Sequence, residues 1–206
     1  ISKNYGLGIE QRFFKRCFDI LLSSIGIIIA SPFMLITAIA IKLCDHGPVL
    51  YKQVRLTKDG KEFKVLKFRS MRTNDEEDSA WSTNEDDRRT FFGALIRKLS
   101  IDELPQLINV LKGDMSIVGP RPEIPHFVEQ FRDEVPLYMI RHMVKPGMTG
   151  LAQVSGYRGD TSIRGRIDCD IAYIENWTIW LDIRIILRTF TSLVNDETLP
   201  PLHREK

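Results

Sequence analysis

ILLSSIGIIIASPFMLITAIAI, residues 20–41, contains no charged side chain. A helix rises about 1.5 Å per residue, so a stretch of this length can cross a hydrocarbon core about 30 Å thick. A cleaved signal peptide is the weaker alternative, because the stretch is longer than a usual signal core and no Ala-x-Ala site follows it. A helix buried in a protein core stays open as a second alternative. The stretch predicts a membrane helix.

Ser31 and Pro32 lie in the middle of this stretch and bear on its path. Pro32 cannot donate a backbone hydrogen bond to the carbonyl of Ile28, so we expect a kink there. Positive residues favour the cytoplasmic side of a membrane. Basic residues flank both ends of the stretch: Arg12, Lys15, Arg16, Lys42, Lys52 and Arg55. A re-entrant helix-break-helix hairpin, with Ser31 and Pro32 as the break, places both ends on one side.

The composition excludes several classes of function. A net charge of +2 over 206 residues is too small for nucleic acid binding across the whole surface. Three cysteines, far apart and without a Cys-x-x-Cys pair, predict neither a disulfide framework nor a zinc site, and indicate a reducing compartment. The four histidines lack metal-ligand spacing, and we assign them no function.

The part of the chain after the apolar stretch begins with strand-like patterns. Residues 47–71 predict a small sheet-like or irregular unit with a turn at Lys58-Asp59-Gly60. Residues 73–89 are acidic and polar, which predicts a solvated loop, with a lid over the site as a secondary interpretation.

Helical spacing dominates the rest of the chain. Apolar residues recur at helical spacing in residues 100–112, with Gly113 as the stop signal, and a second helical pattern covers residues 124–143. Residues 176–194 form a basic amphipathic pattern with tryptophans. Such a helix lies in a membrane interface or packs on a core, and the sequence favours neither.

The predicted fold is therefore mainly α with a small β element. It combines a re-entrant membrane hairpin and amphipathic interfacial helices with a compact cytosolic catalytic domain. We divide the chain into a basic juxtamembrane segment (1–17), the membrane hairpin (18–43) and the catalytic domain (44–206).

Asp102 and Glu103 are adjacent carboxylates at the start of a predicted helix. Ser100 and Glu103 fit a capping box, which would explain the acidic residues by structure alone. The same position favours carboxylates electrostatically and lowers their pKa, which also suits a nucleophile or a metal ligand near phosphates. The pair by itself does not decide between these interpretations.

Four cations on short structured segments accompany the carboxylates: Lys67, Arg69, Arg97 and Arg121. Each alone is best explained as a surface ion-pair partner. Together they supply the charge that a diphosphate needs, since guanidinium groups and Mg²⁺ neutralise phosphates that would otherwise repel an anionic nucleophile. With a membrane helix, they indicate phosphate chemistry at a bilayer surface.

Five motifs resemble those of the bacterial sugar transferase family, the polyprenyl-phosphate sugar-1-phosphate transferases also called monotopic phosphoglycosyl transferases. The resemblance covers residues 14–190. The motifs are KFRSM (67–71), LSIDELPQL (99–107), NVLKGDMS (109–116), GPRP (119–122) and KPGMTGLAQV (145–154).

This resemblance implies that Asp102 is a nucleophile that attacks the sugar-bearing phosphate of a UDP-sugar and releases UMP. Glu103 would hold Mg²⁺. Undecaprenyl phosphate would then attack the aspartyl intermediate, giving an undecaprenyl-diphosphate sugar in a ping-pong scheme. This would be the first membrane step of exopolysaccharide, capsule or O-antigen synthesis, on the cytosolic face of the bacterial inner membrane.

The resemblance also implies a substrate-binding set. Arg158 follows Tyr157, whereas many small members of the family have an arginine directly after the glycine. The chain is in this respect similar to the exopolysaccharide or colanic-acid branch, whose longer members have extra N-terminal membrane helices and often use UDP-glucose; UDP-galactose is a second candidate. The set comprises Lys67, Arg69, Arg97, Arg121, Gln153, Arg158, Asp170 and Asp182.

Partners implied by the resemblance are the UDP-sugar, undecaprenyl phosphate and the lipid bilayer, with a homodimer left open and no nucleic acid. Two other classes of protein fit part of the pattern. A membrane-anchored phosphatase or nuclease would use the same carboxylates with water as acceptor. A non-catalytic membrane scaffold would need only the apolar and amphipathic helices.

Overall fold

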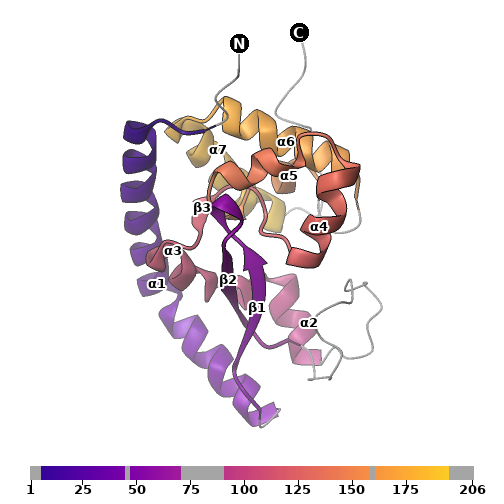
Figure 1. The fold of residues 1–206 in the computed structure, drawn as a ribbon. Coiled ribbons are helices and arrows are strands. Elements are labelled where there is room, and N and C mark those ends of the chain that lie inside the picture. The colour runs from indigo at the N-terminus through magenta and orange to yellow at the C-terminus, as the bar shows by residue number, and fades with distance from the viewer. Residues whose placement is uncertain (1–5, 45–46, 71–90, 158–160, 195–206) are drawn as a thin grey trace.

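One long helix, α1 (Ile9–Cys44), runs along one side of the other elements (Figure 1). The computed structural model describes residues 6–44, 47–70, 91–157 and 161–194. Within these ranges the chain is mainly helical and has two sheets of two strands each, which agrees with the predicted fold class. The acidic stretch 73–89, with its predicted lid, lies outside the described residues.

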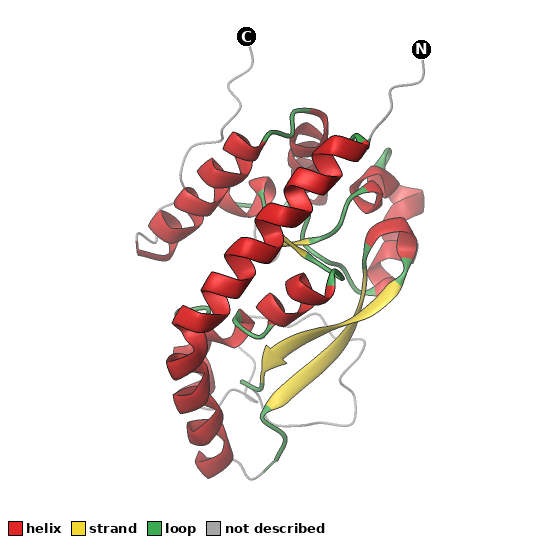
Figure 2. Cartoon of the chain, turned by 90° about the vertical axis from the view of Figure 1, so that its left-hand side faces the viewer, coloured by secondary structure: helices red, strands yellow, loops and turns green. Residues whose placement is uncertain are grey.

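Helix α1 continues through Pro32 as one α-helix but changes direction along its length, as Figures 1 and 2 show. The Ser31 hydroxyl donates to the Ile28 carbonyl at 2.8 Å. This is the carbonyl that Pro32 leaves without its helical partner. The Ser31 side chain therefore supplies a hydrogen bond that Pro32 cannot, and the helix continues through this position. Re-entry through one membrane face stays a prediction, because the faces at which the helix enters and leaves are defined only relative to a bilayer.

The two sides of α1 differ sharply in character. Its most apolar stretch has a mean hydropathy of 2.3 with 11% of it buried. By length and composition α1 could cross a membrane. The side that faces the rest of the protein instead buries polar residues, among them Lys15, Asp19, Ser23 and Thr37. The exposed large apolar residues are Ile9, Phe13, Phe14, Ile20, Leu21, Ile25, Ile28, Ile29, Phe33, Leu35, Ile36, Ile39 and Leu43.

The basic residues before the apolar stretch have partners inside the protein. Arg12 donates to the carbonyl of Leu7, and Lys15 is buried in an ion pair with Asp182 at 2.7 Å. Arg16 donates to two main-chain carbonyls at 2.6 and 2.7 Å. These cations therefore lend less support to a shared cytoplasmic side than their sequence positions indicated. The helix also passes the predicted boundary between residues 17 and 18 without a break.

The predicted small sheet is confirmed as an antiparallel hairpin. Strand β1 (Leu50–Leu56) pairs with β2 (Glu62–Phe68), and the one-turn η1 (Lys58–Gly60) connects them. Asp59 and Gly60 both have positive φ values, of 60° and 71°. The turn signal in the sequence correctly located the connection. The hairpin appears as paired strands in Figure 2.

The predicted helix over residues 100–112 is present in two pieces. A 3₁₀ turn, η2 (Ile101–Glu103), is followed by α3 (Gln106–Lys112). Pro105 lies between them and has no amide to donate, so a continuous α-helix cannot pass through it with all its hydrogen bonds. Gly113 ends α3 with a φ of 96°, as predicted. A short helix that the sequence did not predict, α2 (Phe91–Lys98), precedes the turn.

The second half of the chain is more divided than the sequence predicted. The helical pattern 124–143 forms α4 (Pro125–Glu134) and the 3₁₀ helix η3 (Tyr138–Met143), because Leu137 adopts a φ of 63° between them. After α5 (Leu151–Val154) comes a helix that we did not predict, α6 (Ile163–Glu175), and then α7 (Ile179–Val194), which matches the predicted amphipathic helix. Trp180, 74% exposed, lies on its outer side.

A parallel pair of short strands, β3 (Ser116–Val118) and β4 (Gly147–Thr149), joins the two halves. Val118 of β3 belongs to a core cluster that also contains residues of η3, α5, α6 and α7. Its buried members are Leu7, Val118, Ile140, Val144, Leu151, Val154, Tyr173, Ile174, Trp177 and Ile185.

Glycines allow the main chains of the two paired strands to approach closely. A Cβ at Gly147 would lie 2.1 Å from the amide nitrogen of Gly119, and a Cβ at Gly119 would lie 2.6 Å from the Lys145 carbonyl oxygen. A Cβ at Gly150 would lie 2.2 Å from the Gly119 carbonyl oxygen. Main-chain atoms cannot move aside as a flexible side chain can, so this close approach requires glycine.

We expect Gly147→Ala to lower the free energy of unfolding by about 3 kcal/mol, because the added methyl group overlaps main-chain atoms. Gly60→Ala is the matched control: it strains a positive φ but meets no atom within 4 Å, and should cost about 1 kcal/mol. Urea unfolding of the detergent-solubilised protein measures both. Equal losses of unfolding free energy in the two variants would show that the main chains are not tightly packed at Gly147.

Candidate active site

Asp102 and Glu103 lie on the η2 turn between α2 and α3. The turn begins at Ser100 with a left-handed φ of 54°, and the amide of Glu103 donates to the Ser100 carbonyl at 3.3 Å. No side-chain hydrogen bond caps the turn. The predicted capping box is therefore wrong, since the Glu103 side chain makes ion pairs elsewhere. This removes the structural explanation that the sequence offered for the two acidic residues.

Glu103 is the partner of two cations from separate elements. Its Oε1 accepts from Lys67 Nζ at 2.8 Å and from Arg121 Nη2 at 3.1 Å, and neither contacts Oε2. Burial alone would raise the pKa of this carboxyl, but Arg121 and Lys67 together hold it well below its ordinary value. Glu103 is therefore ionised throughout the physiological pH range.

The position of Lys67 depends on a buried asparagine that joins the sheet to the helix. Asn109 Oδ1 accepts from the Leu66 amide at 3.0 Å, and its Nδ2 donates to the Lys64 carbonyl at 2.9 Å. Asn109 thus completes hydrogen bonds along the free side of β2 and attaches the strand to α3. Lys67, next along the strand, is held at a defined position relative to the η2 turn.

Asp102 is 7% exposed and has the opposite electrostatic balance. Burial raises the pKa of its carboxyl, with a further increase from Glu103, against the lowering effects of Lys67 and Arg97. The expectation that the helix start lowers this pKa is therefore wrong for Asp102, because desolvation dominates. A poorly solvated carboxylate close to cations is suited to nucleophilic attack.

The donor set can be compared with the needs of a divalent metal ion. Among the described residues, no cluster of three or more His, Cys, Asp or Glu side chains is present. Mg²⁺ commonly takes only one or two carboxylates and completes its shell with water and substrate phosphates. Glu103, whose Oε2 neither cation contacts, fits this mode of binding. The described residues do not supply enough ligands for a metal site built from protein side chains alone.

Other predicted substrate-binding residues lie in different surroundings. The Arg69 guanidinium packs directly against Gly47. Gln153 donates to the Met148 carbonyl at 3.3 Å from α5. Arg158 lies outside the described residues.

The two late aspartates belong to buried ion pairs. Asp182 accepts from Lys15 at 2.7 Å, from Tyr173 at 2.8 Å and from Trp177 at 3.2 Å, which connects α7 with α1 and α6. Asp170 pairs with Arg141 at 3.1 Å, and burial raises the pKa of Asp170 to about 6. These contacts give both residues structural roles, and substrate binding by either stays a prediction.

Three residues that support the site were not predicted: Asn109, Glu123 and Arg141. Each is a polar residue that the fold buries. Asn109 could have been noticed, because an asparagine among the apolar positions of a helix is unusual. The other two lie in stretches where no local pattern distinguishes a buried charge from an exposed one.

Comparisons with known proteins find one matching family and several similar proteins. Residues 10–196 match the family described as bacterial sugar transferase. A UDP-glucose:undecaprenyl-phosphate glucose-1-phosphate transferase of Klebsiella pneumoniae is 47% identical over 188 residues, which cover 88% of this chain and 40% of that protein. A UDP-N-acetylgalactosamine-undecaprenyl-phosphate N-acetylgalactosaminephosphotransferase of Aeromonas hydrophila is 49% identical over 185 residues, covering 88% and 44% respectively.

A shorter relative matches over almost its whole length. The exopolysaccharide production protein PSS of Rhizobium leguminosarum bv. phaseoli is 45% identical over 190 residues, covering 86% of this chain and 94% of that protein. By contrast, the chain spans less than half of the Klebsiella and Aeromonas proteins.

Lys67→Met should lower stability most at neutral pH, and the difference from the parent protein should narrow as the pH falls. Lys67 lowers the pKa of Glu103 and of Asp102, so its removal raises both. The charge of Glu103 stabilises the fold above the ordinary carboxyl pKa, and this contribution is lost as the pH falls through the folded-state pKa. With a folded-state pKa closer to the ordinary value, this contribution is smaller at neutral pH, and less of it is left to lose in acid. Thermal unfolding midpoints from about pH 7 to about pH 3 measure the effect.

Lys64→Met is the matched control, because Lys64 lies exposed on the same strand. Its midpoint should follow the parent profile. Identical acid profiles for the two variants would contradict the assigned role of Lys67.

Proposed function

Because the chain belongs to the bacterial sugar transferase family, we propose that it transfers a sugar-1-phosphate from a UDP-sugar to undecaprenyl phosphate. The observation that carries this proposal is the arrangement around Asp102. A buried carboxylate lies beside Glu103, which binds two cations through one oxygen. Phosphoryl transfer requires a positioned nucleophile among cations that neutralise phosphate charge.

The chemistry divides into two displacements at phosphorus. The Asp102 carboxylate attacks the phosphorus that bears the sugar, the bond to the UMP oxygen breaks, and UMP leaves with that electron pair. An oxygen of undecaprenyl phosphate then attacks the same phosphorus. The bond to Asp102 breaks and the carboxylate is regenerated. Neither step needs an added base, because both nucleophiles are anionic.

The surrounding cations have separate tasks in this proposal. Arg121 and Lys67 hold Glu103 and present positive charge toward the diphosphate, and Arg97 lowers the pKa of Asp102 against the effect of burial. Mg²⁺, held by Glu103 and the substrate phosphates, would supply further neutralisation of the diphosphate.

Helix α1 supports a site at the membrane. Its exposed side is apolar, and α7 exposes Trp180, Leu187 and Phe190 beside arginines on the same helix. We propose that α1 enters the cytoplasmic membrane from the cytosolic side with its bend near Pro32, and that α7 lies in the interface. The lipid phosphate would then reach Asp102 without leaving the headgroup region.

The reaction is tested by incubation with a UDP-sugar, with and without undecaprenyl phosphate. One equivalent of UMP without lipid, and turnover with lipid, are expected for the transferase. Steady release of sugar phosphate without lipid would indicate the hydrolase. No turnover and no nucleotide binding would indicate a scaffold. A panel of UDP-glucose, UDP-galactose and UDP-N-acetylgalactosamine would identify the sugar.

Asp102→Asn should abolish both UMP release and covalent labelling by a UDP-sugar carrying radioactive phosphorus next to the sugar. We expect a loss on the order of 1,000-fold or more, because the amide cannot form the intermediate. Asp133→Asn, an exposed aspartate on α4, is the control and should retain parent activity. Labelled protein or full turnover in the Asp102 variant would remove Asp102 as the nucleophile.

Glu103→Gln should raise the Mg²⁺ concentration needed for half-maximal UMP release by about 10-fold or more, because a neutral amide is a weaker ligand for a hard cation. A chelator should abolish the activity of the parent protein, and added Mg²⁺ should restore it. An unchanged Mg²⁺ requirement in the variant would contradict metal binding by Glu103.

A further inference from the structure

The loop that carries Arg121 is attached to the protein at every main-chain carbonyl from residue 120 to residue 123. Each carbonyl accepts one hydrogen bond, and the four donors come from different places. The donors are the Gly147 amide to Pro120 at 2.9 Å, Arg141 Nη2 to Arg121 at 2.9 Å, Arg55 Nη1 to Pro122 at 3.2 Å and the Leu56 amide to Glu123 at 3.1 Å. Four successive carbonyls held in this way leave the loop little freedom.

Glu123 holds the two arginine donors in place. Its carboxylate lies 3.5 Å from Arg141 and 3.9 Å from Arg55, and it also pairs with Arg166 at 3.0 Å. Arg141 has a second carboxylate partner in Asp170 at 3.1 Å. Glu123 and Arg141 are almost completely buried, so each charge depends on these partners for its stability in the interior.

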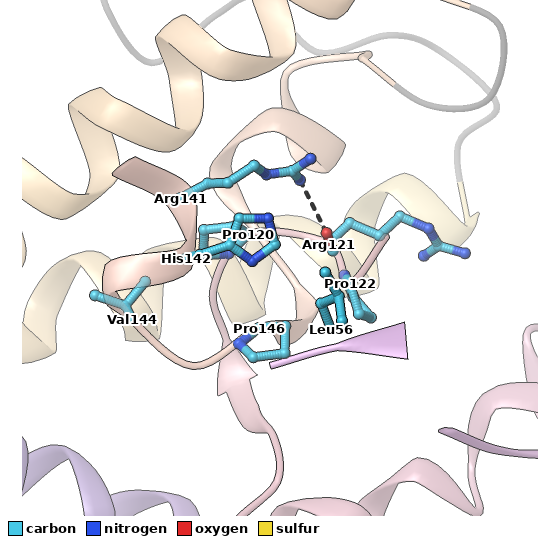
Figure 3. A pocket seen from close by; sticks show the side chains of 8 residues that line it. All are labelled: Leu56, Pro120, Arg121, Pro122, Arg141, His142, Val144 and Pro146. Carbon is cyan, nitrogen blue, oxygen red and sulfur yellow. Dashed lines mark hydrogen bonds between the residues drawn. The ribbon is translucent and has the colours of Figure 1, made fainter. Parts of the chain in front are cut away.

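Arg121 directs its side chain away from this cluster. Figure 3 shows the Arg141 guanidinium at the Arg121 carbonyl, with the Arg121 guanidinium extending in another direction. That guanidinium reaches Glu103 at 3.1 Å. Because Pro120 and Pro122 have fixed φ angles, the held main chain determines where the Arg121 side chain starts.

We propose that Arg141 and Arg55, aligned by Glu123, are positioning residues that keep the Arg121 guanidinium at Glu103 and at the reacting phosphates. They act through the Arg121 and Pro122 carbonyls and do not contact substrate. The inference rests on the proposed function for its catalytic consequence. The attachment of the loop rests on the contacts alone.

The geometry of arginine is needed at position 141. Its guanidinium donates to the Arg121 carbonyl and to the Tyr138 hydroxyl, the latter at 3.3 Å, and forms an ion pair with Asp170. A lysine keeps the charge but concentrates it on one nitrogen, which cannot span these partners. Arg141→Lys should therefore release the loop while retaining a cation.

The test is a double-mutant cycle of UMP release with the full chain in lipid nanodiscs. In the parent background, Arg141→Lys should lower kcat by about 10- to 100-fold with a smaller change in KM, because a catalytic group is misplaced. In the Arg121→Ala background the same substitution should lower kcat less than about 2-fold, because the group that it positions is gone. Equal losses in the two backgrounds would overturn the proposal.

Lys15→Met provides the matched control. Lys15 is also a buried, ion-paired cation, but its partner Asp182 lies on α7 and not at the loop. Its effect on kcat should be the same with and without Arg121. If Lys15→Met and Arg121→Ala were as non-additive in kcat as Arg141→Lys and Arg121→Ala, the cause would be a general loss of packing. That result would also overturn the proposal.

Two further measurements cover other outcomes. If Arg141→Lys does not fold, Arg55→Lys is tested in the same cycle, since Arg55 is partly exposed and holds the next carbonyl. If the parent protein releases no UMP with any UDP-sugar, the proposed function fails, and thermal unfolding decides the positioning claim. Arg121→Ala and Glu103→Gln are each measured alone and then combined. In the parent background their shifts in unfolding midpoint should not add, whereas in the Arg141→Lys background they should add. Unchanged non-additivity would overturn the claim.

Discussion

The close approach of two main chains at β3 and β4 is the constraint on which the rest of the structure depends. Gly119 and Gly147 approach each other with no space for a side chain. This close approach joins the half of the chain that contains α1, the hairpin and α3 to the half that contains α4 to α7. It also sets the starting point of the loop with Arg121. Two motifs distant in sequence thus form one local structure, and each needs its glycines because of the other.

The two carboxylates of the η2 turn differ because their surroundings differ. Glu103 has two cations in direct contact, and its pKa is lowered; Asp102 is buried with cations only nearby, and its pKa is raised. Adjacent groups of the same chemical type can therefore suit different roles: Glu103 is a permanent anion that pairs with cations, and Asp102 would be the reactive carboxylate of the proposed transfer. The division results from which elements the fold brings to the turn, and not from the residues themselves.

Local patterns predicted those parts of the fold that local physics determines. The membrane-type helix, the hairpin and the amphipathic last helix follow from hydrophobic length and periodicity. The helix breaks at Pro105 and Leu137 were missed, although the proline was visible, because helical spacing of apolar residues continued across both. In the site, Lys67 was found through its motif. Asn109 and Arg141 were not, since their partners lie 45 and 20 residues away and only the folded chain selects them.

The buried polar side of α1 has a consequence for how the protein can be dissected. Lys15 neutralises a carboxylate of α7, Arg16 binds the last carbonyls of α3, and Asp19 accepts from Ser116 and from the Ile117 amide in β3. Helix α1 is thus an integral part of the globular core. Removing α1 to obtain a water-soluble fragment would leave the buried Asp182 carboxylate without its cation. It would also leave the last carbonyls of α3 without their arginine donor. A chimera bearing a generic leader helix would inherit the same defects, however hydrophobic that helix was.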